Sequence, residues 1–160
     1  MLIILMGVAG SGKTTVGREL ARELGWKFYD ADDFHTRASV EKMSRGVPLD
    51  DEDRAPWLER LRELIESCVG RGESAVLACS ALKQSYRRML LIDESVKLVY
   101  LKGDRELIRE RLSKRDGHFM KPEMLDSQFD ALEEPERGLT VDISATPEEI
   151  AAKIRERFGL

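Results

Sequence analysis

A glycine-rich stretch near the start of the chain has the residue types of a phosphate-binding loop. The stretch GVAGSGKT, residues 7–14, fits the pattern Gly-x-x-x-x-Gly-Lys-Thr. Its glycines let the backbone turn tightly, so that successive N–H groups point at phosphate oxygens. Lys13 is expected to reach the β- and γ-phosphates, and the Thr14 hydroxyl to ligate Mg²⁺. A glycine-rich turn of purely structural origin is the alternative. The predicted triphosphate site comprises Gly7, Gly10, Ser11, Gly12, Lys13, Thr14 and Thr15.

The absence of one residue type helps to decide which nucleotide this loop binds. A GTPase of the Ras type would read guanine through an Asn-Lys-x-Asp stretch, and this sequence contains no asparagine. ATP is therefore the expected nucleotide.

Carboxylates follow the second predicted strand. The stretch YDADDFH, residues 29–35, places Asp30 and Asp32 just past the carboxyl end of that strand. Doubly wound sheets bind their ligands there. We expect Asp30 to help hold Mg²⁺ and Asp32 to accept a proton from an acceptor hydroxyl. The alternative is a solvated loop acid or a helix cap, which we favour for Asp33.

The elements that must position these groups alternate along the chain. Short apolar runs typical of buried strands are separated by helical patterns that begin at caps and end at glycines. Strands are expected over 2–6, 27–30, 75–79, 97–101 and 139–143, and helices over 13–24, 51–70, 104–115 and 147–158. The alternation predicts an α/β fold with a parallel sheet covered on both faces. Segments at about 31–50 and 116–136 fit it poorly and are predicted to be mobile and to face the substrate.

Composition limits the possible partners. The 160 residues fit one domain. A net charge of −4 argues against a nucleic-acid binder that relies on bulk positive potential. The longest apolar run, residues 2–6, is too short for a signal peptide or a membrane span, so we expect a cytoplasmic protein without a membrane partner. Cys68 and Cys79 are expected to be buried thiols.

Several stretches together resemble one family. They are GVAGSGKT, DADDFH, and residues 41–58, 79–87, 100–104 and 117–135. Their order is similar to that in the gluconate kinases, or gluconokinases, and the resemblance runs over nearly the whole chain. It implies a single P-loop kinase domain over residues 1–160, in three layers, with a five-stranded parallel sheet of order 2-3-1-4-5. A substrate-binding segment at about 31–60 and a mobile lid at about 116–136 would cover the site.

The resemblance also implies a reaction. ATP and D-gluconate would give 6-phosphogluconate and ADP, with Mg²⁺ as cofactor, and the protein would form a homodimer. Gluconate carries a carboxylate and a row of hydroxyls, and the guanidinium fork of Arg54 suits a planar carboxylate. An ion pair with Asp50 or Asp51 is the alternative for Arg54. Further candidates for contact with the substrate are Asp32, His35, Lys83, Arg87 and His118.

Two arginines of a predicted helix are candidates for the nucleotide. Arg111 and Arg115 lie four residues apart and so share one helix face. In related kinases the first of two such arginines stacks on adenine, and the second contacts the phosphates. Pro147 would form the other side of the adenine slot, although its place at the first helical position explains it without a ligand. The implied catalytic residues are Lys13, Asp32 and Arg115.

Other functions compete with this interpretation. Shikimate kinases share the fold and the Asp-x-Asp pattern, but CSALK stands where their glycine-rich third-strand loop is expected. A nucleoside monophosphate or antibiotic kinase is a further alternative within the same class. A regulator that binds a nucleotide without turnover is the alternative from another class, and the intact set of Lys13, Thr14, Asp32 and Arg115 argues against it.

Overall fold

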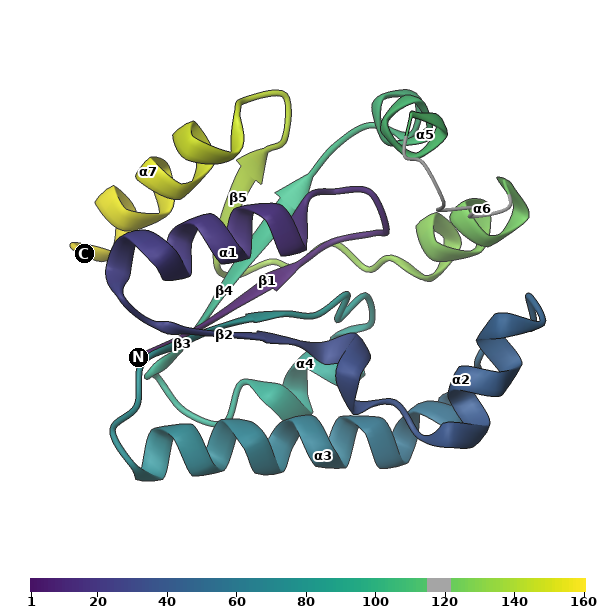
Figure 1. The fold of residues 1–160 in the computed structure, drawn as a ribbon, viewed down its shortest axis with the longest axis horizontal. Coiled ribbons are helices and arrows are strands. Elements are labelled where there is room, and N and C mark those ends of the chain that lie inside the picture. Colours follow the sequence, from purple (N-terminus) through teal and green to yellow (C-terminus); the bar gives the residue numbers. More distant parts are fainter. Residues whose placement is uncertain (115–121) are drawn as a thin grey trace.

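A five-stranded parallel sheet forms the centre of the computed structural model, which describes residues 1–114 and 122–160 (Figure 1). The strand order is β2-β3-β1-β4-β5, and every neighbouring pair is parallel. The predicted order is therefore confirmed. The strands are β1 (Leu2–Met6), β2 (Lys27–Asp30), β3 (Ala75–Ala78), β4 (Val96–Lys102) and β5 (Leu139–Asp142), each within one residue of its expected bounds.

Helices cover both faces of the sheet, as Figure 1 shows. One layer contains α3 (Asp51–Gly70) and α4 (Gln84–Leu90), whose apolar side chains pack against Leu2, Ile4 and Met6 of β1. The opposite layer packs against Ile3 and Leu5. Because β1 is buried on both faces, all five of its residues are apolar. The opposite layer contains α1 (Lys13–Leu24), α5 (Arg105–Ser113), α6 (Pro122–Ala131) and α7 (Pro147–Phe158).

The helix ends follow the local rules that the sequence indicated. Asp50 and Asp53 form a capping box at the start of α3, and Thr146 and Glu149 form another at the start of α7. Gly25 adopts the left-handed conformation that ends α1. These caps fix where each helix starts and stops, and so which side chains reach the edge of the sheet where the strands end.

The segment over 31–50 contains two short helices that the apolar pattern did not predict. They are a 3₁₀-helix, η1 (Ala31–Phe34), and α2 (Arg37–Ser44), which the Thr36 side chain caps by accepting from Ser39 N–H. Helix α2 buries only Ser39, so it has no apolar stripe to reveal it. The chain thus departs from regular strand-helix alternation just beyond β2, beside the predicted site.

Two further expectations concern cysteines and membranes. Cys68 and Cys79 are free and buried, as predicted. Among the described residues, no helix has the length and apolar character needed to cross a membrane.

Candidate active site

The glycine-rich loop joins β1 to α1 and needs its glycines for two reasons. Gly10 and Gly12 have positive φ angles of 79° and 93°, which side chains with a Cβ rarely adopt. At Gly10 a Cβ would also lie 2.8 Å from Cγ of Leu112 on α5. At Gly7 a Cβ would lie 2.6 Å from Ser11 Oγ. The loop is therefore fixed by contacts as well as by backbone conformation.

Lys13 is the first residue of α1, and its side chain folds over the loop. Its ammonium group donates to the carbonyl oxygens of Gly7 at 3.0 Å and Val8 at 2.9 Å. The same residue lines the cavity that the loop borders. A positive charge thus lies beside the backbone N–H groups at the start of a helix, where an anion is stabilised.

Thr14 and Asp30 place two oxygen atoms side by side. Thr14 Oγ1 donates to Asp30 Oδ2 at 3.3 Å, and Asp30 Oδ1 accepts from Asp32 N–H at 3.0 Å. In the described ranges, no three His, Cys, Asp or Glu residues form a cluster that could hold a metal by themselves. An Mg²⁺ ion here would take phosphate oxygens and waters in addition to these two side chains. Mg²⁺ prefers that kind of mixed oxygen shell, so the residues fit this cofactor.

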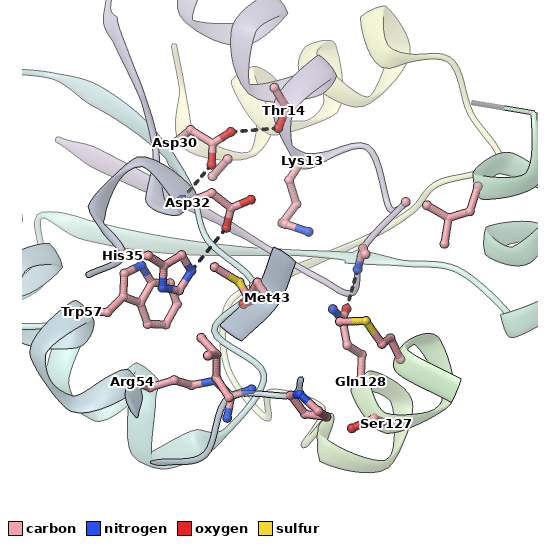
Figure 2. A pocket seen from close by; sticks show the side chains of 18 of the residues that line it. Lys13, Thr14, Asp30, Asp32, His35, Met43, Arg54, Trp57, Ser127 and Gln128 are labelled. Atoms are coloured by element: carbon pink, nitrogen blue, oxygen red, sulfur yellow. Dashed lines mark hydrogen bonds and ion pairs between the residues drawn. The ribbon is translucent and has the colours of Figure 1, made fainter. Parts of the chain in front are cut away.

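A cavity of about 430 Å³ extends from the phosphate loop to α3 and α6, and Figure 2 shows many of the side chains that line it. The residues come from distant parts of the sequence. The structure brings together five of the ionisable residues expected there, namely Lys13, Asp30, Asp32, His35 and Arg54.

Asp32 and His35 lie next to each other at the cavity. His35 Nε2 is 3.7 Å from Asp32 Oδ1, and the imidazole stacks on Trp57 with ring centroids 4.6 Å apart. The Trp57 indole N–H in turn donates to Ala31 O at 2.7 Å, so the imidazole packs on an anchored ring. The His35 side chain is 7% exposed, whereas that of Asp32 is 86% exposed. The imidazole and, more weakly, the charge of Lys13 lower the pKa of Asp32, which keeps its carboxylate ionised.

Arg54 reaches the cavity from the first turns of α3. The structure does not show the alternative, an ion pair between Arg54 and Asp50 or Asp51. Its Nη1 donates to the Tyr86 hydroxyl at 3.3 Å, while Asp50 caps α3 and Asp51 accepts from Lys83. The guanidinium therefore lines the cavity beside a neutral partner.

Lys83 and Arg87 are engaged outside the cavity lining. Lys83 Nζ pairs with Asp51 Oδ1 at 2.8 Å. Arg87 is buried, and its guanidinium donates to three main-chain carbonyls, those of Ala81, Leu82 and Glu133, at 2.8 to 2.9 Å. These bonds fasten the loop after β3 to the segment after α6, which is a structural task. Contact of either cation with the substrate stays a prediction.

A second hollow of about 260 Å³ lies on the other side of the phosphate loop. Six residues that were assigned to the nucleotide line this hollow, namely Gly10, Ser11, Gly12, Thr15, Arg111 and Pro147. Arg111 Nη2 donates to Ile143 O at 2.5 Å, which holds the guanidinium against the loop before α7. Its stacking on adenine stays a prediction. Arg115 and His118 lie outside the described residues.

The sequence interpretation missed part of the lining. Ser127 and Gln128 of α6 face the cavity beside Met124, which belongs to the predicted lid segment, and Met43 of α2 joins them. Gln128 Oε1 accepts from Ala9 N–H at 2.7 Å, so α6 touches the phosphate loop directly. The spacing of 124, 127 and 128 places these residues on one helix face, and that periodicity is the signal that could have found them.

Comparison with known proteins supports the class that this geometry suggests. The family model described as shikimate kinase matches residues 9–157. Parallel strands in the order 2-3-1-4-5 and a phosphate-binding loop after β1 accompany this match. The fold and the site define a P-loop kinase of the shikimate kinase family.

Relatives within that class are more specific. The thermosensitive gluconokinase of Escherichia coli is 48% identical, over 83% of this chain and 72% of its own. A probable gluconokinase of Rattus norvegicus is 46% identical, over 97% and 96% of the two chains. A gluconokinase structure from Sinorhizobium meliloti superposes with a TM-score of 0.86 at 37% identity and covers 98% of this chain and 94% of that one. The chain belongs to the gluconokinase family.

Proposed function

We propose that this protein transfers the γ-phosphoryl group of ATP to D-gluconate and releases 6-phospho-D-gluconate and ADP. The observation that carries the proposal is that Lys13 and Arg54 line the same cavity. The first is suited to a phosphate, and the second to a carboxylate. The relatives named above support gluconate as the sugar acid.

The phosphates of ATP are held by main-chain groups of the loop and by Lys13. Phosphoryl transfer asks mainly for alignment and for neutralisation of charge on the transferring oxygens. Arg111 and Pro147 border the hollow that would take the adenine. By the family resemblance, Arg115 would contact the phosphates. Thr14 and Asp30 would hold Mg²⁺, which supplies further neutralisation of the β- and γ-phosphates when bound.

Asp32 is the proposed acceptor of the substrate proton. The oxygen of the terminal gluconate hydroxyl forms a bond to the γ-phosphorus, and the bond from that phosphorus to the β–γ bridging oxygen breaks. ADP leaves with the electron pair of the broken bond, and the hydroxyl proton passes to the Asp32 carboxylate. Because the pKa of Asp32 is lowered, this base is ionised at neutral pH.

Helix α6 is the described part of the proposed lid. Its face lines the cavity, and Gln128 bonds to the phosphate loop. We propose that α6 helps to exclude water from the transfer, because an open site would hydrolyse ATP. His118, in the same proposed lid, stays a candidate for substrate contact.

The oligomeric state and the compartment are also proposals. The family resemblance supports a homodimer that acts on a small molecule. The short apolar runs support a cytoplasmic protein without a membrane partner, and the net charge of −4 argues against a nucleic acid as partner. Light scattering on the purified protein tests the dimer, because a mass close to twice 18.2 kDa is expected. A mass near 18.2 kDa at assay concentration would contradict it.

A panel of phosphoryl acceptors tests the reaction. ADP release is measured with Mg²⁺ and ATP in the presence of gluconate, shikimate, AMP or no acceptor. We expect rapid release with gluconate alone. Release with shikimate instead would favour the other activity of this fold, and equal release without any acceptor would indicate an ATPase or a switch protein.

A further inference from the structure

Arg54 belongs to a hydrogen-bonded chain of four side chains, which the other three members extend away from the cavity. Arg54 Nη1 donates to the Tyr86 hydroxyl at 3.3 Å, and that hydroxyl donates to the Asp51 carboxylate. Lys83 Nζ donates to the same carboxylate oxygen at 2.8 Å. Only Arg54 of these four lines the main cavity, as far as the chain is described. Any effect of the other three on a ligand in this cavity would therefore pass through Arg54.

Tyr86 is the fixed member of this chain. Its side chain belongs to the core cluster between the sheet and α3, and the residue is 7% exposed. The cationic groups of Arg54 and Lys83 lie 5.9 and 5.6 Å from the centre of its ring. Contacts of this length attract a cation to the ring face. The ring and the hydroxyl together restrain a long side chain that would otherwise sample many rotamers.

The charged members of this group of four side chains are Arg54, Lys83 and Asp51, and their sum is positive. Asp51 carries one negative charge, which its partner Lys83 already balances. Arg54 is bonded to a neutral hydroxyl, so its own charge is not cancelled by this contact. Burial and the Asp51 carboxylate raise the pKa of Tyr86, so the hydroxyl keeps its proton. Lys83 and, more weakly, Arg54 lower the pKa of Asp51, and these two positive charges against one negative charge leave a net positive charge for an anion.

We propose that Tyr86 is a positioning residue that orients Arg54 toward the carboxylate of the acceptor. The proposal rests on the function proposed above, because it takes a sugar acid as the acceptor. The carboxylate lies at the end of gluconate remote from the reacting hydroxyl. An interaction there stabilises the ground state and the transition state alike, so its loss raises KM and leaves kcat unchanged.

The variant Tyr86→Phe tests the proposal, because it removes the hydroxyl and keeps the ring. We expect the KM for gluconate to rise about threefold to tenfold, as for a typical lost hydrogen bond, with kcat and the KM for ATP within about twofold. Tyr29→Phe is the matched control. It removes a hydroxyl that also bonds to a carboxylate, that of Glu73, in a cluster away from the cavity lining. Its kinetics should match those of the unaltered protein.

A double-mutant cycle separates positioning from general packing. Arg54→Gln should lower kcat/KM for gluconate by about tenfold or more, and Tyr86→Phe should then have almost no further effect, because its partner is gone. Asp51→Asn is a second variant for the same chain, on a side chain that is 68% exposed. Like Tyr86→Phe, it should raise the KM for gluconate.

Two results would overturn the inference. One is an unchanged KM for gluconate in Tyr86→Phe, and the other is an equal effect of Tyr86→Phe with and without Arg54. Both presuppose that the unaltered protein phosphorylates gluconate. If it does not, the proposed function fails first, and the acceptor panel reports that failure separately.

Discussion

The two ends of the main cavity are built by different means. At the proposed phosphate end, the binding groups come from a short contiguous loop, whose glycines and first helical residue supply main-chain N–H groups and one ammonium. At the proposed acceptor end, the groups are side chains from separate elements, such as Asp32 and Arg54. Phosphate is the same in every kinase of this class, whereas the acceptor differs. A loop that binds through its backbone therefore suits the phosphate, and side chains that can differ between kinases suit the acceptor.

The largest expected effect is at the phosphate end, in Lys13→Ala. Loss of the ammonium removes charge stabilisation of the transferring phosphoryl group, so kcat should fall by about a hundredfold or more. The side chain lies over the loop and is absent from the core, so the thermal midpoint should change little. Steady-state kinetics and a thermal melt measure the two quantities. Near-normal turnover would show that the loop is not the centre of catalysis.

A smaller effect is expected from Gly10→Ala. The new Cβ would meet Leu112 at 2.8 Å, in addition to the cost of a φ of 79°. The left-handed backbone conformation alone should lower the free energy of unfolding by about 1 to 2 kcal/mol when the residue has a Cβ. Gly72→Ala is the matched control, because Gly72 has a φ of 63° and open space around its Cβ position. Both variants should unfold at lower urea concentrations, but only Gly10→Ala should also raise the KM for ATP. Equal kinetics in the two would mean that the loop tolerates distortion.

These glycines and Lys13 could be predicted from the sequence for a simple physical reason. A loop that binds phosphate through its own backbone is encoded locally, so its residue types and spacing are visible in eight consecutive positions. Asp30 and Asp32 were also found, since the carboxyl end of a parallel strand faces the ligand site in this fold class. The strand order followed from the family resemblance.

The acceptor end could be predicted only in part. Lys83 and Arg87 were proposed from their charge and their place close behind β3, and their contact with the substrate stays a prediction. What the sequence did not indicate is that Arg87 donates to carbonyl groups and that Lys83 pairs with Asp51. Gln128 was missed, because its role depends on α6 lying beside a loop that is 119 residues away in the sequence. Side-chain direction and such distant contacts are set by tertiary packing, which local patterns do not contain.

A contact between the two ends gives the third prediction. Gln128→Ala removes the acceptor that Ala9 N–H has on α6, so α6 loses this bond to the phosphate loop. We expect kcat/KM for both substrates to fall about threefold to tenfold, the worth of one hydrogen bond. Gln84→Ala, at the exposed start of α4, is the control and should be neutral. An effect on gluconate alone would place Gln128 at the acceptor end only.

The smallest effect is a pH dependence at the acceptor end. His35 is the main cause of the lowered pKa of Asp32, so His35→Gln should let that pKa rise toward 3.8. A carboxyl group with a lowered pKa acts as a base above that pKa and loses this action as the pH falls through it. The acid limb of the kcat/KM profile should therefore move to higher pH, with little change at pH 7. An acid limb at unchanged pH would contradict the proposed role of Asp32 in the proton transfer.

The account depends most on one cavity that holds ATP at Lys13 and a sugar acid at Arg54. Initial rates of Arg54→Gln, with ATP and gluconate varied in turn, test this directly. The account predicts that the KM for gluconate rises about tenfold or more, as for a lost charged hydrogen bond, while the KM for ATP stays within about twofold. An unchanged KM for gluconate, or an equal rise of both constants, would contradict it.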